Sequence, residues 1–224
     1  MGLGYKEITK LLSTTFVELK EKENITFCEL GNNYLKGPKL MEWLKDNGFD
    51  LTIGGEQHSQ GVVSKLFWEK IGFIHTSIDM NEYDGALNID LRTPVPVELV
   101  NKFDIVYDGG TGEHVDNQYN LFKNCHDMVK VGGIVVHILP KVGSFPGHCS
   151  YYYTVETFNK LGNLNSYNIK ELYDHDADGG PMVYAVFEKV LNKPFINEEE
   201  FKTVPITYTS YSARDKGLYP YAYK

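Results

Sequence analysis

Hydrophobic residues recur every three or four positions in several stretches of the chain. The first such set is Ile8, Leu11, Leu12, Phe16 and Leu19. Because an α-helix repeats every 3.6 residues, this spacing predicts an amphipathic helix over residues 5–21. Further helices are predicted over residues 38–45, 60–71, 115–129 and 154–161. Gly72 and the Gly132-Gly133 pair are expected to end two of them.

Short apolar runs of the kind that form buried strands lie between these helices. The first run, residues 25–31, is Ile-Thr-Phe-Cys-Glu-Leu-Gly. Further strands are predicted over residues 73–79, 85–90, 103–108, 133–139, 169–173 and 182–190. Residues 49–53 are expected to be extended, and the tail from residue 191, rich in Tyr and Pro, has no clear period.

Strands that alternate with helices predict an α/β fold, here a Rossmann-like, doubly wound, mostly parallel sheet with helices on both faces. A chain of 224 residues is long enough for one well-packed domain and short for two. We therefore expect a single domain over residues 1–224, made of an N-terminal helix (5–21), a core (25–190) and a tail (191–224).

Several predicted strands end on residues suited to binding a ligand. The first ends at Gly31, and the next three end at Asp79, Asp90 and Asp108. Ligands of doubly wound sheets bind beyond the carboxyl ends of the strands, so these residues are expected at the binding edge. Each aspartate has an ordinary alternative role, because Asp after a strand is often a turn former or a helix N-cap.

Each strand-end position suits a different contact. Asp79 is placed to accept hydrogen bonds from ribose hydroxyls, as acidic residues do in dinucleotide sites. Asp90 is suited to an adenine amino group, with Leu91 against the ring. Asp108 precedes Gly109 and Gly110, whose backbone allows close approach of a reacting group.

With these residues in view, the chain resembles class I S-adenosylmethionine-dependent methyltransferases over about residues 25–190. Glu29-Leu30-Gly31 matches the core of the first motif of that family, and Asp79 matches its ribose-binding acid. Asp90 and Asp108 resemble its adenine-contacting acid and its motif after the fourth strand. The resemblance implies S-adenosyl-L-methionine as cofactor. It implies a cofactor site formed by Glu29, Gly31, Asn32, Asp79, Met80, Asp90, Leu91 and Asp108.

A closer likeness is to uncharacterised methyltransferase-domain proteins of bacterial surface-polysaccharide and phage gene sets. It is carried by residues 108–115 and 132–140, by Gly147-His148 and by Tyr151. The first motif departs from the family pattern, because Gly31-Asn-Asn-Tyr-Leu-Lys-Gly37 stands where a glycine-rich turn is usual. The leading hypothesis is methyl transfer to a small-molecule or sugar acceptor, at oxygen. The alternative is a non-catalytic cofactor-binding or scaffold protein.

An oxygen nucleophile is helped by a general base, and histidine is the side chain best matched to neutral pH. His114 and His148 are the candidate catalytic bases, with Asp108 beside the reacting group and Glu113 able to orient an imidazole. His137, inside a strand, is more simply explained as a buried structural histidine. Asp108, Glu113, His114 and His148 also include the donor types of a divalent metal site, but the metal-free hypothesis is preferred.

Charge, cysteine content and hydropathy bear on the partner, the compartment and the kind of site. The formal charge of −8, without a basic cluster, disfavours a nucleic-acid partner. Three widely spaced cysteines argue against a disulfide framework and a thiolate zinc site. The first ten residues lack the apolar core of a secretory signal, and no stretch is long enough for a membrane span. We therefore expect a cytoplasmic protein that acts on a small molecule without a membrane partner; a homo-oligomer is a further possibility.

Overall fold

The computed structural model describes the chain except for residues 1, 18–22, 52–60 and 210–224. Its centre is a six-stranded sheet, in the order β5-β2-β6-β7-β10-β9. These strands are β5 (Ile74–Ile78), β2 (Thr26–Leu30), β6 (Phe103–Gly109), β7 (Val129–Pro140), β10 (Gly180–Glu188) and β9 (Asn168–Ala177). Strand β10 is antiparallel to both its neighbours, and the other neighbouring pairs are parallel. The predicted mostly parallel α/β sheet is confirmed.

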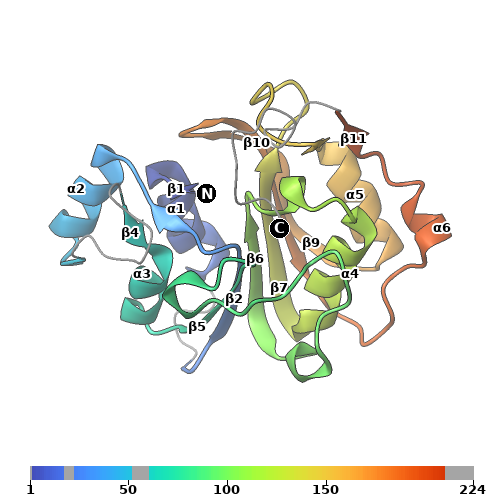
Figure 1. The fold of residues 1–224 in the computed structure, drawn as a ribbon, viewed down its shortest axis with the longest axis horizontal. Coiled ribbons are helices and arrows are strands. Elements are labelled where there is room, and N and C mark those ends of the chain that lie inside the picture. Colours follow the sequence, from blue (N-terminus) through green and yellow to red (C-terminus); the bar gives the residue numbers. More distant parts are fainter. Residues whose placement is uncertain (1, 18–22, 52–60, 210–224) are drawn as a thin grey trace.

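Helices cover both faces of this sheet (Figure 1). On one side lie α1 (Tyr5–Lys10), α2 (Pro38–Asp46) and α3 (Ser64–Lys70), and on the other lie α4 (Gln118–Met128) and α5 (Val155–Leu164). Shorter elements are η1 (Leu11–Thr15), η3 (Tyr83–Gly85), η4 (Val97–Leu99), η5 (Gly112–His114) and α6 (Glu198–Phe201). None of the helices in the described ranges is long and apolar enough to cross a bilayer.

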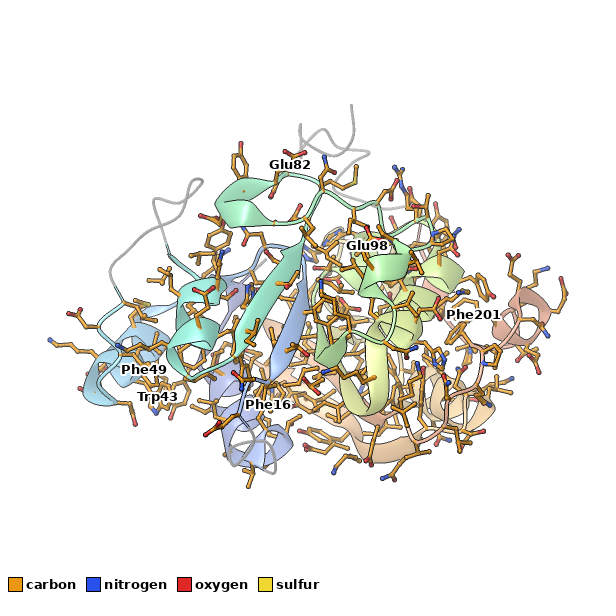
Figure 2. The ribbon with its side chains drawn as sticks, turned by 90° about the horizontal axis from the view of Figure 1, so that it is seen from below. Phe16, Trp43, Phe49, Glu82, Glu98 and Phe201 are labelled. Atoms are coloured by element: carbon orange, nitrogen blue, oxygen red, sulfur yellow. The ribbon has the colours of Figure 1, made fainter. Side chains whose placement is uncertain are left out.

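The core is divided into two layers because alternate strand residues point to opposite faces. In β2, Phe27 packs against Trp68 of α3, with ring centroids 4.8 Å apart, whereas Cys28 belongs to the cluster on the α4 side. Figure 2 shows the same division, with Phe16 and Phe201 on opposite sides of the sheet. Burial on both faces explains the nearly unbroken apolar runs of the central strands.

Two small sheets complete the fold. Strand β3 (Tyr34–Leu35) lies between β1 (Gly2–Leu3), to which it is parallel, and β4 (Val62–Val63), to which it is antiparallel. Strand β8 (Tyr151–Tyr152) pairs with β11 (Thr207–Tyr208). The first of these sheets ties the N-terminus to the chain that follows β2.

The predicted third strand, residues 85–90, is wrong. Only Leu87 bridges to β5, through the Leu87 N–H to the Ser77 carbonyl and the Asp79 N–H to the Leu87 carbonyl. The segment follows Asp84 and Gly85, both with positive φ, and ends in the turn in which the Thr93 N–H bonds to the Asp90 carbonyl. Too few residues remain between these turns to extend along β5.

Several element boundaries also differ from prediction. The helix predicted over residues 60–71 starts later, because the β-branched pair Val62-Val63 forms β4 before α3 starts at Ser64; residue 60 lies outside the described part of the chain. The N-terminal helix continues as the π-helical η1, and its predicted end at residues 18–21 lies outside the described part of the chain. Gly132 and Gly133 lie inside β7 rather than ahead of it. Residues 49–51 are not in a strand, and 52–53 are not described.

Candidate active site

Three of the four strand-end residues predicted from sequence lie at the ends of three adjacent strands. In the sheet, Leu30 at the end of β2 pairs with Ile78 of β5 on one side and with Asp108 of β6 on the other. Gly31, Asp79 and Asp108 therefore lie along one edge of the sheet. At this edge the chain leaves β2 toward β5 on one side, and β6 lies on the other side. In doubly wound sheets this is the position of the ligand crevice.

Asp79 links the first two loops of this edge. One carboxylate oxygen accepts a hydrogen bond from the Asn32 backbone N–H at 2.9 Å, and the other accepts from the Asn81 N–H at 3.1 Å. The side chain is half-buried, and Met80 beside it is 39% exposed. Asp79 is thus fixed in position while part of it still faces solvent.

The loop after β2 is built without the usual glycine-rich sequence. Asn32 Nδ2 and the Tyr34 hydroxyl both donate to Asp84 Oδ2, at 2.8 and 2.9 Å. Asn32, Asn33 and Tyr34 are all buried, and Asn33 Oδ1 has no hydrogen-bond partner among the described residues. The side chain of Asn32 is engaged inside the protein, so its contact to a cofactor would come from the backbone.

Gly31 is required by its local packing. Its φ is +79°, and a Cβ at this position would lie 2.4 Å from Thr111 Oγ1. That hydroxyl donates to the Leu30 carbonyl at 2.7 Å, which fixes the loop after β6 against the end of β2. The glycine therefore permits the close approach of the two loops that form this edge.

Asp90 lies in the turn that replaces the predicted third strand. Its carboxylate accepts hydrogen bonds from Arg92 Nε and Nη2, the second at 2.7 Å. These bonds hold the pKa of Asp90 below its usual value. Leu91 is buried, 6% exposed, in the core on the α4 side. A role for either residue in adenine binding stays a prediction.

Glu29 and Asp108 are fully buried and bind groups inside the protein. Glu29 Oε2 accepts from the Ser64 hydroxyl at 2.6 Å and lies 3.1 Å from His75 Nε2, both on the α3 side of the sheet. Asp108 Oδ1 accepts from the Gly112 N–H at 2.9 Å, and its Oδ2 lies 3.1 Å from His137 Nδ1. Both carboxylates support the edge from within; direct contact of either with a cofactor stays a prediction.

The turn that follows Asp108 positions Glu113, the next acidic residue in the sequence. Gly110 has φ of +83°, and a Cβ on Gly112 would lie 2.6 Å from Asp108 Oδ2, so the turn depends on its glycines. It leads into η5, which carries Glu113 and His114. Glu113 is 0% exposed, and neither carboxylate oxygen has a hydrogen-bond partner among the described residues. Burial, and secondarily the charge of Asp108, raise the pKa of Glu113 well above its usual value.

Both predicted catalytic histidines lie beside Glu113. Glu113 Oε1 is 3.8 Å from His114 Nε2 and 3.9 Å from His148 Nε2, and the two imidazole rings are 4.9 Å apart in an edge-to-face arrangement. Burial lowers the pKa of both histidines, and for His114 the neighbouring His148 adds to the effect. Both imidazoles are therefore neutral near pH 7. The structure brings these two residues together although 33 positions separate them in the sequence.

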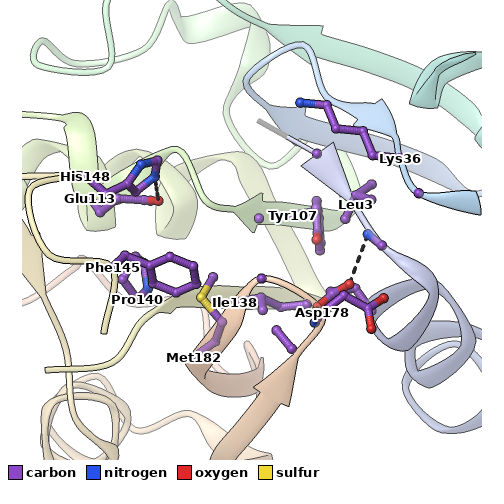
Figure 3. Close-up of a pocket in the computed structure, with 17 residues that line it drawn as sticks. Leu3, Lys36, Tyr107, Glu113, Ile138, Pro140, Phe145, His148, Asp178 and Met182 are labelled. Atoms are coloured by element: carbon purple, nitrogen blue, oxygen red, sulfur yellow. Dashed lines mark hydrogen bonds and ion pairs between the residues drawn. The ribbon is translucent and has the colours of Figure 1, made fainter. Parts of the chain in front are cut away.

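A cavity of about 370 Å³ opens beside this cluster, beyond the ends of β6 and β7 (Figure 3). Its apolar lining includes Leu3, Tyr107, Ile138, Pro140, Phe145 and Met182. Glu113 and His148 lie together at one side, with Lys36 and Asp178 elsewhere on the wall. Such a cavity, mainly apolar with a few convergent polar groups, is typical of a small-molecule site.

The sequence pattern did not identify most of this lining. The N-terminal residues Gly2 and Leu3 reach the cavity because β1 pairs with β3, a contact that no local pattern signals. Phe145 is held by its carbonyl, which accepts from the Tyr152 hydroxyl at 2.8 Å. The run Tyr151–Tyr153, which follows His148 closely in the sequence, does not line the cavity. Gly109 and Pro140 are different, because both directly follow predicted strands and that position indicates the ligand-binding edge.

Comparison with known proteins gives a likeness in fold. No protein-family model and no curated protein sequence matches the chain. Among solved structures it is similar to 1,6-didemethyltoxoflavin-N1-methyltransferase from Burkholderia thailandensis, bound to 1,6-didemethyltoxoflavin and S-adenosylhomocysteine. The two share 10% identity with a TM-score of 0.51, over 79% of this chain and 76% of that one.

Two weaker likenesses are also found. The 16S rRNA (adenine(1408)-N(1))-methyltransferase from Catenulisporales acidiphilia has a TM-score of 0.45 and 9% identity, over 80% of this chain and 93% of that one. An S-adenosylmethionine-dependent methyltransferase from Mesorhizobium loti has a TM-score of 0.39 and 10% identity, over 80% and 100%. The chain has the Rossmann-like α/β fold of class I S-adenosylmethionine-dependent methyltransferases.

Proposed function

We propose that this protein is an S-adenosylmethionine-dependent methyltransferase that transfers a methyl group to an oxygen of a small-molecule or sugar acceptor. The observation that carries the proposal is the position of the cavity. It is lined by the last residues of β6 and β7, and one of them, Gly109, directly follows Asp108 of the edge formed by Gly31, Asp79 and Asp108. A cofactor on that edge and an acceptor in the cavity would be neighbours, as methyl transfer requires.

The residues at the edge fit the adenosine part of the cofactor. Asp79 accepts one backbone hydrogen bond on each oxygen and remains partly exposed, so it retains capacity to accept from ribose hydroxyls. The exposed side chain of Met80 offers an apolar surface to the base. Gly31 and the backbone of Asn32 complete the edge. When bound there, S-adenosylmethionine supplies the electrophilic methyl group.

The cavity sets the class of acceptor. A volume of about 370 Å³ is near the lower end for ligand pockets and suits a molecule of one or two rings. Its apolar walls would cover the faces of such a molecule. The cluster of Glu113, His114 and His148 is the part of the site able to bind a hydroxyl group and receive or release its proton.

Calorimetric titration with S-adenosylhomocysteine tests the cofactor site. We expect one binding site per chain and at least about tenfold weaker binding by Asp79→Ala, because hydrogen bonds to a charged carboxylate contribute about 1.5–3 kcal/mol each. The matched control is Asp176→Ala. Asp176 is an exposed acid on β9 that pairs with Lys6 of α1, so this variant should bind like the wild type. Thermal unfolding of each variant shows whether the loop remains folded. Absence of binding by the wild-type protein would favour the non-catalytic alternative.

The histidines give a second test once an acceptor is found by screening nucleotide sugars and small hydroxylated molecules. His114→Ala and His148→Ala should lower turnover at least about a hundredfold, in the range usual for loss of acid–base catalysis. Cofactor affinity should change little, because neither side chain lies on the Asp79 side of the edge. Full turnover in both variants would remove the cluster from the mechanism.

A further inference from the structure

The polar cluster beside the cavity has an arrangement that hydrogen bonding does not explain. His114 and His148 both direct Nε2 at the same oxygen of Glu113, at 3.8 and 3.9 Å. These distances are too long for hydrogen bonds. All three donor atoms nevertheless lie within 4.8 Å of one another. Three groups with lone pairs therefore face one common point.

The burial of Glu113 is the second observation. Both of its oxygens are inaccessible and unpartnered among the described residues, although an isolated buried carboxylate is costly. The residues next to it supply imidazoles rather than a lysine or arginine. A bound cation would provide the compensating charge that this carboxylate otherwise lacks.

We infer that Glu113, His114 and His148 form a binding site for a divalent transition-metal ion of the zinc class. Two imidazole nitrogens and one carboxylate oxygen favour such an ion over Mg²⁺ or Ca²⁺, which take mainly oxygen ligands. Bonds of about 2.0–2.2 Å to a shared ion require ligand atoms about 3–3.5 Å apart, so side-chain movements of about 1 Å or less close the site. This inference departs from the metal-free site favoured by the sequence.

The site has an open side. Three protein ligands leave at least one coordination position of a tetrahedral ion free, as in catalytic zinc sites. Glu113 and His148 line the cavity, so the open position faces the space assigned to the acceptor (Figure 3). In this role, which rests on the proposed function, the ion binds the acceptor hydroxyl and lowers its pKa, and the proton passes to solvent water.

The test is metal binding by the full chain without cofactor or acceptor. The protein is freed of metal with a chelator and titrated with Zn²⁺ in a calorimeter and with Co²⁺ in a spectrophotometer. We expect one ion per chain and visible absorption bands from Co²⁺ held by nitrogen and oxygen ligands. His114→Ala and His148→Ala should each weaken binding more than about tenfold, as loss of a direct ligand does at least as much as loss of its supporting contacts.

The matched control is His175→Ala, whose histidine lies 3.9 Å from Glu7 in a pair of the same chemistry. Its metal affinity should equal that of the wild type, and metal-free thermal unfolding shows that the variants are folded. Absence of saturable binding, or equal binding by wild type and both cluster variants, would overturn the inference. Neither result alters the S-adenosylhomocysteine titration, so failure of the metal site and failure of the proposed function are distinguishable.

Discussion

Individual carboxylates in this protein differ sharply in what surrounds them, although several follow strands in the same way. Asp79 stays partly exposed and accepts hydrogen bonds from the backbone N–H groups of Asn32 and Asn81. Glu29 and Asp108 are enclosed and hydrogen-bonded, whereas Glu113 is enclosed and has no hydrogen-bond partner in the described part of the chain. Asp79 is accessible to a ligand, Glu29 and Asp108 support the structure, and Glu113 is a ligand of the metal ion that we infer. Residue identity and strand position alone do not separate these roles.

Glu29 provides a test of the structural role. Glu29→Ala would leave the Ser64 hydroxyl and His75 Nε2 without their buried acceptor, so we expect a loss of about 3–5 kcal/mol in the free energy of unfolding. Glu29→Gln, which keeps a carbonyl oxygen, should lose less. Urea denaturation measures both.

The same variants address the cofactor role that the family resemblance gives to Glu29. Because its side chain lies on the α3 side of the sheet, folded Glu29→Gln should bind S-adenosylhomocysteine with wild-type affinity. A large loss of affinity without loss of stability would restore a direct contact.

At the scale of elements, helix α4 is joined to the C-terminal part of the chain through a buried histidine. His126 Nε2 lies 2.8 Å from the Lys193 carbonyl, and its Nδ1 lies 2.6 Å from the Tyr167 hydroxyl. A carbonyl only accepts, so Nε2 carries the proton and Nδ1 accepts from the tyrosine. Burial, with a contribution from Lys189, lowers the pKa of His126 from 6.5 to about 4.

The lowered pKa of His126 determines how the free energy of unfolding changes with pH. Above pH 6.5 His126 is neutral in both the folded and the unfolded chain, and it contributes no pH dependence. As the pH falls from 6.5 to about 4, only the unfolded chain takes up the proton, so the free energy of unfolding decreases by about 3–3.5 kcal/mol. Below about 4 the contribution becomes constant.

Urea denaturation across this pH range, with His126→Gln as reference, isolates the effect. Glutamine can still donate to the Lys193 carbonyl but does not titrate, so its stability should fall less steeply with acidification. Identical slopes for the two proteins would contradict the assignment.

At the scale of the whole molecule, the sheet and its binding edge could be predicted because they depend on local patterns. Apolar runs that end at Gly31, Asp79 and Asp108 mark strands, and parallel strands place their ends together. The direction of some side chains could also be predicted from the sequence. Phe27 and Glu29 are two positions apart in β2 and so share a face of the sheet. That face packs against α3.

The rest depends on contacts between distant segments. The cavity joins residues 2–4 to β6, β7 and β10. The element η5, which carries the buried Glu113, packs against β7 and β8. The predicted strand over residues 85–90 failed because backbone turns on both sides, rather than its apolar content, determine its course. Tertiary packing and turn geometry of this kind leave little trace in hydrophobic periodicity.

A crystal structure of the protein with S-adenosylhomocysteine tests the central claim most directly. We expect the ribose hydroxyls within hydrogen-bond distance of Asp79, the base beside Met80, and the sulfur facing the cavity bounded by Gly109 and His148. Cofactor found elsewhere, or crystals grown at saturating cofactor that contain none, would contradict the account.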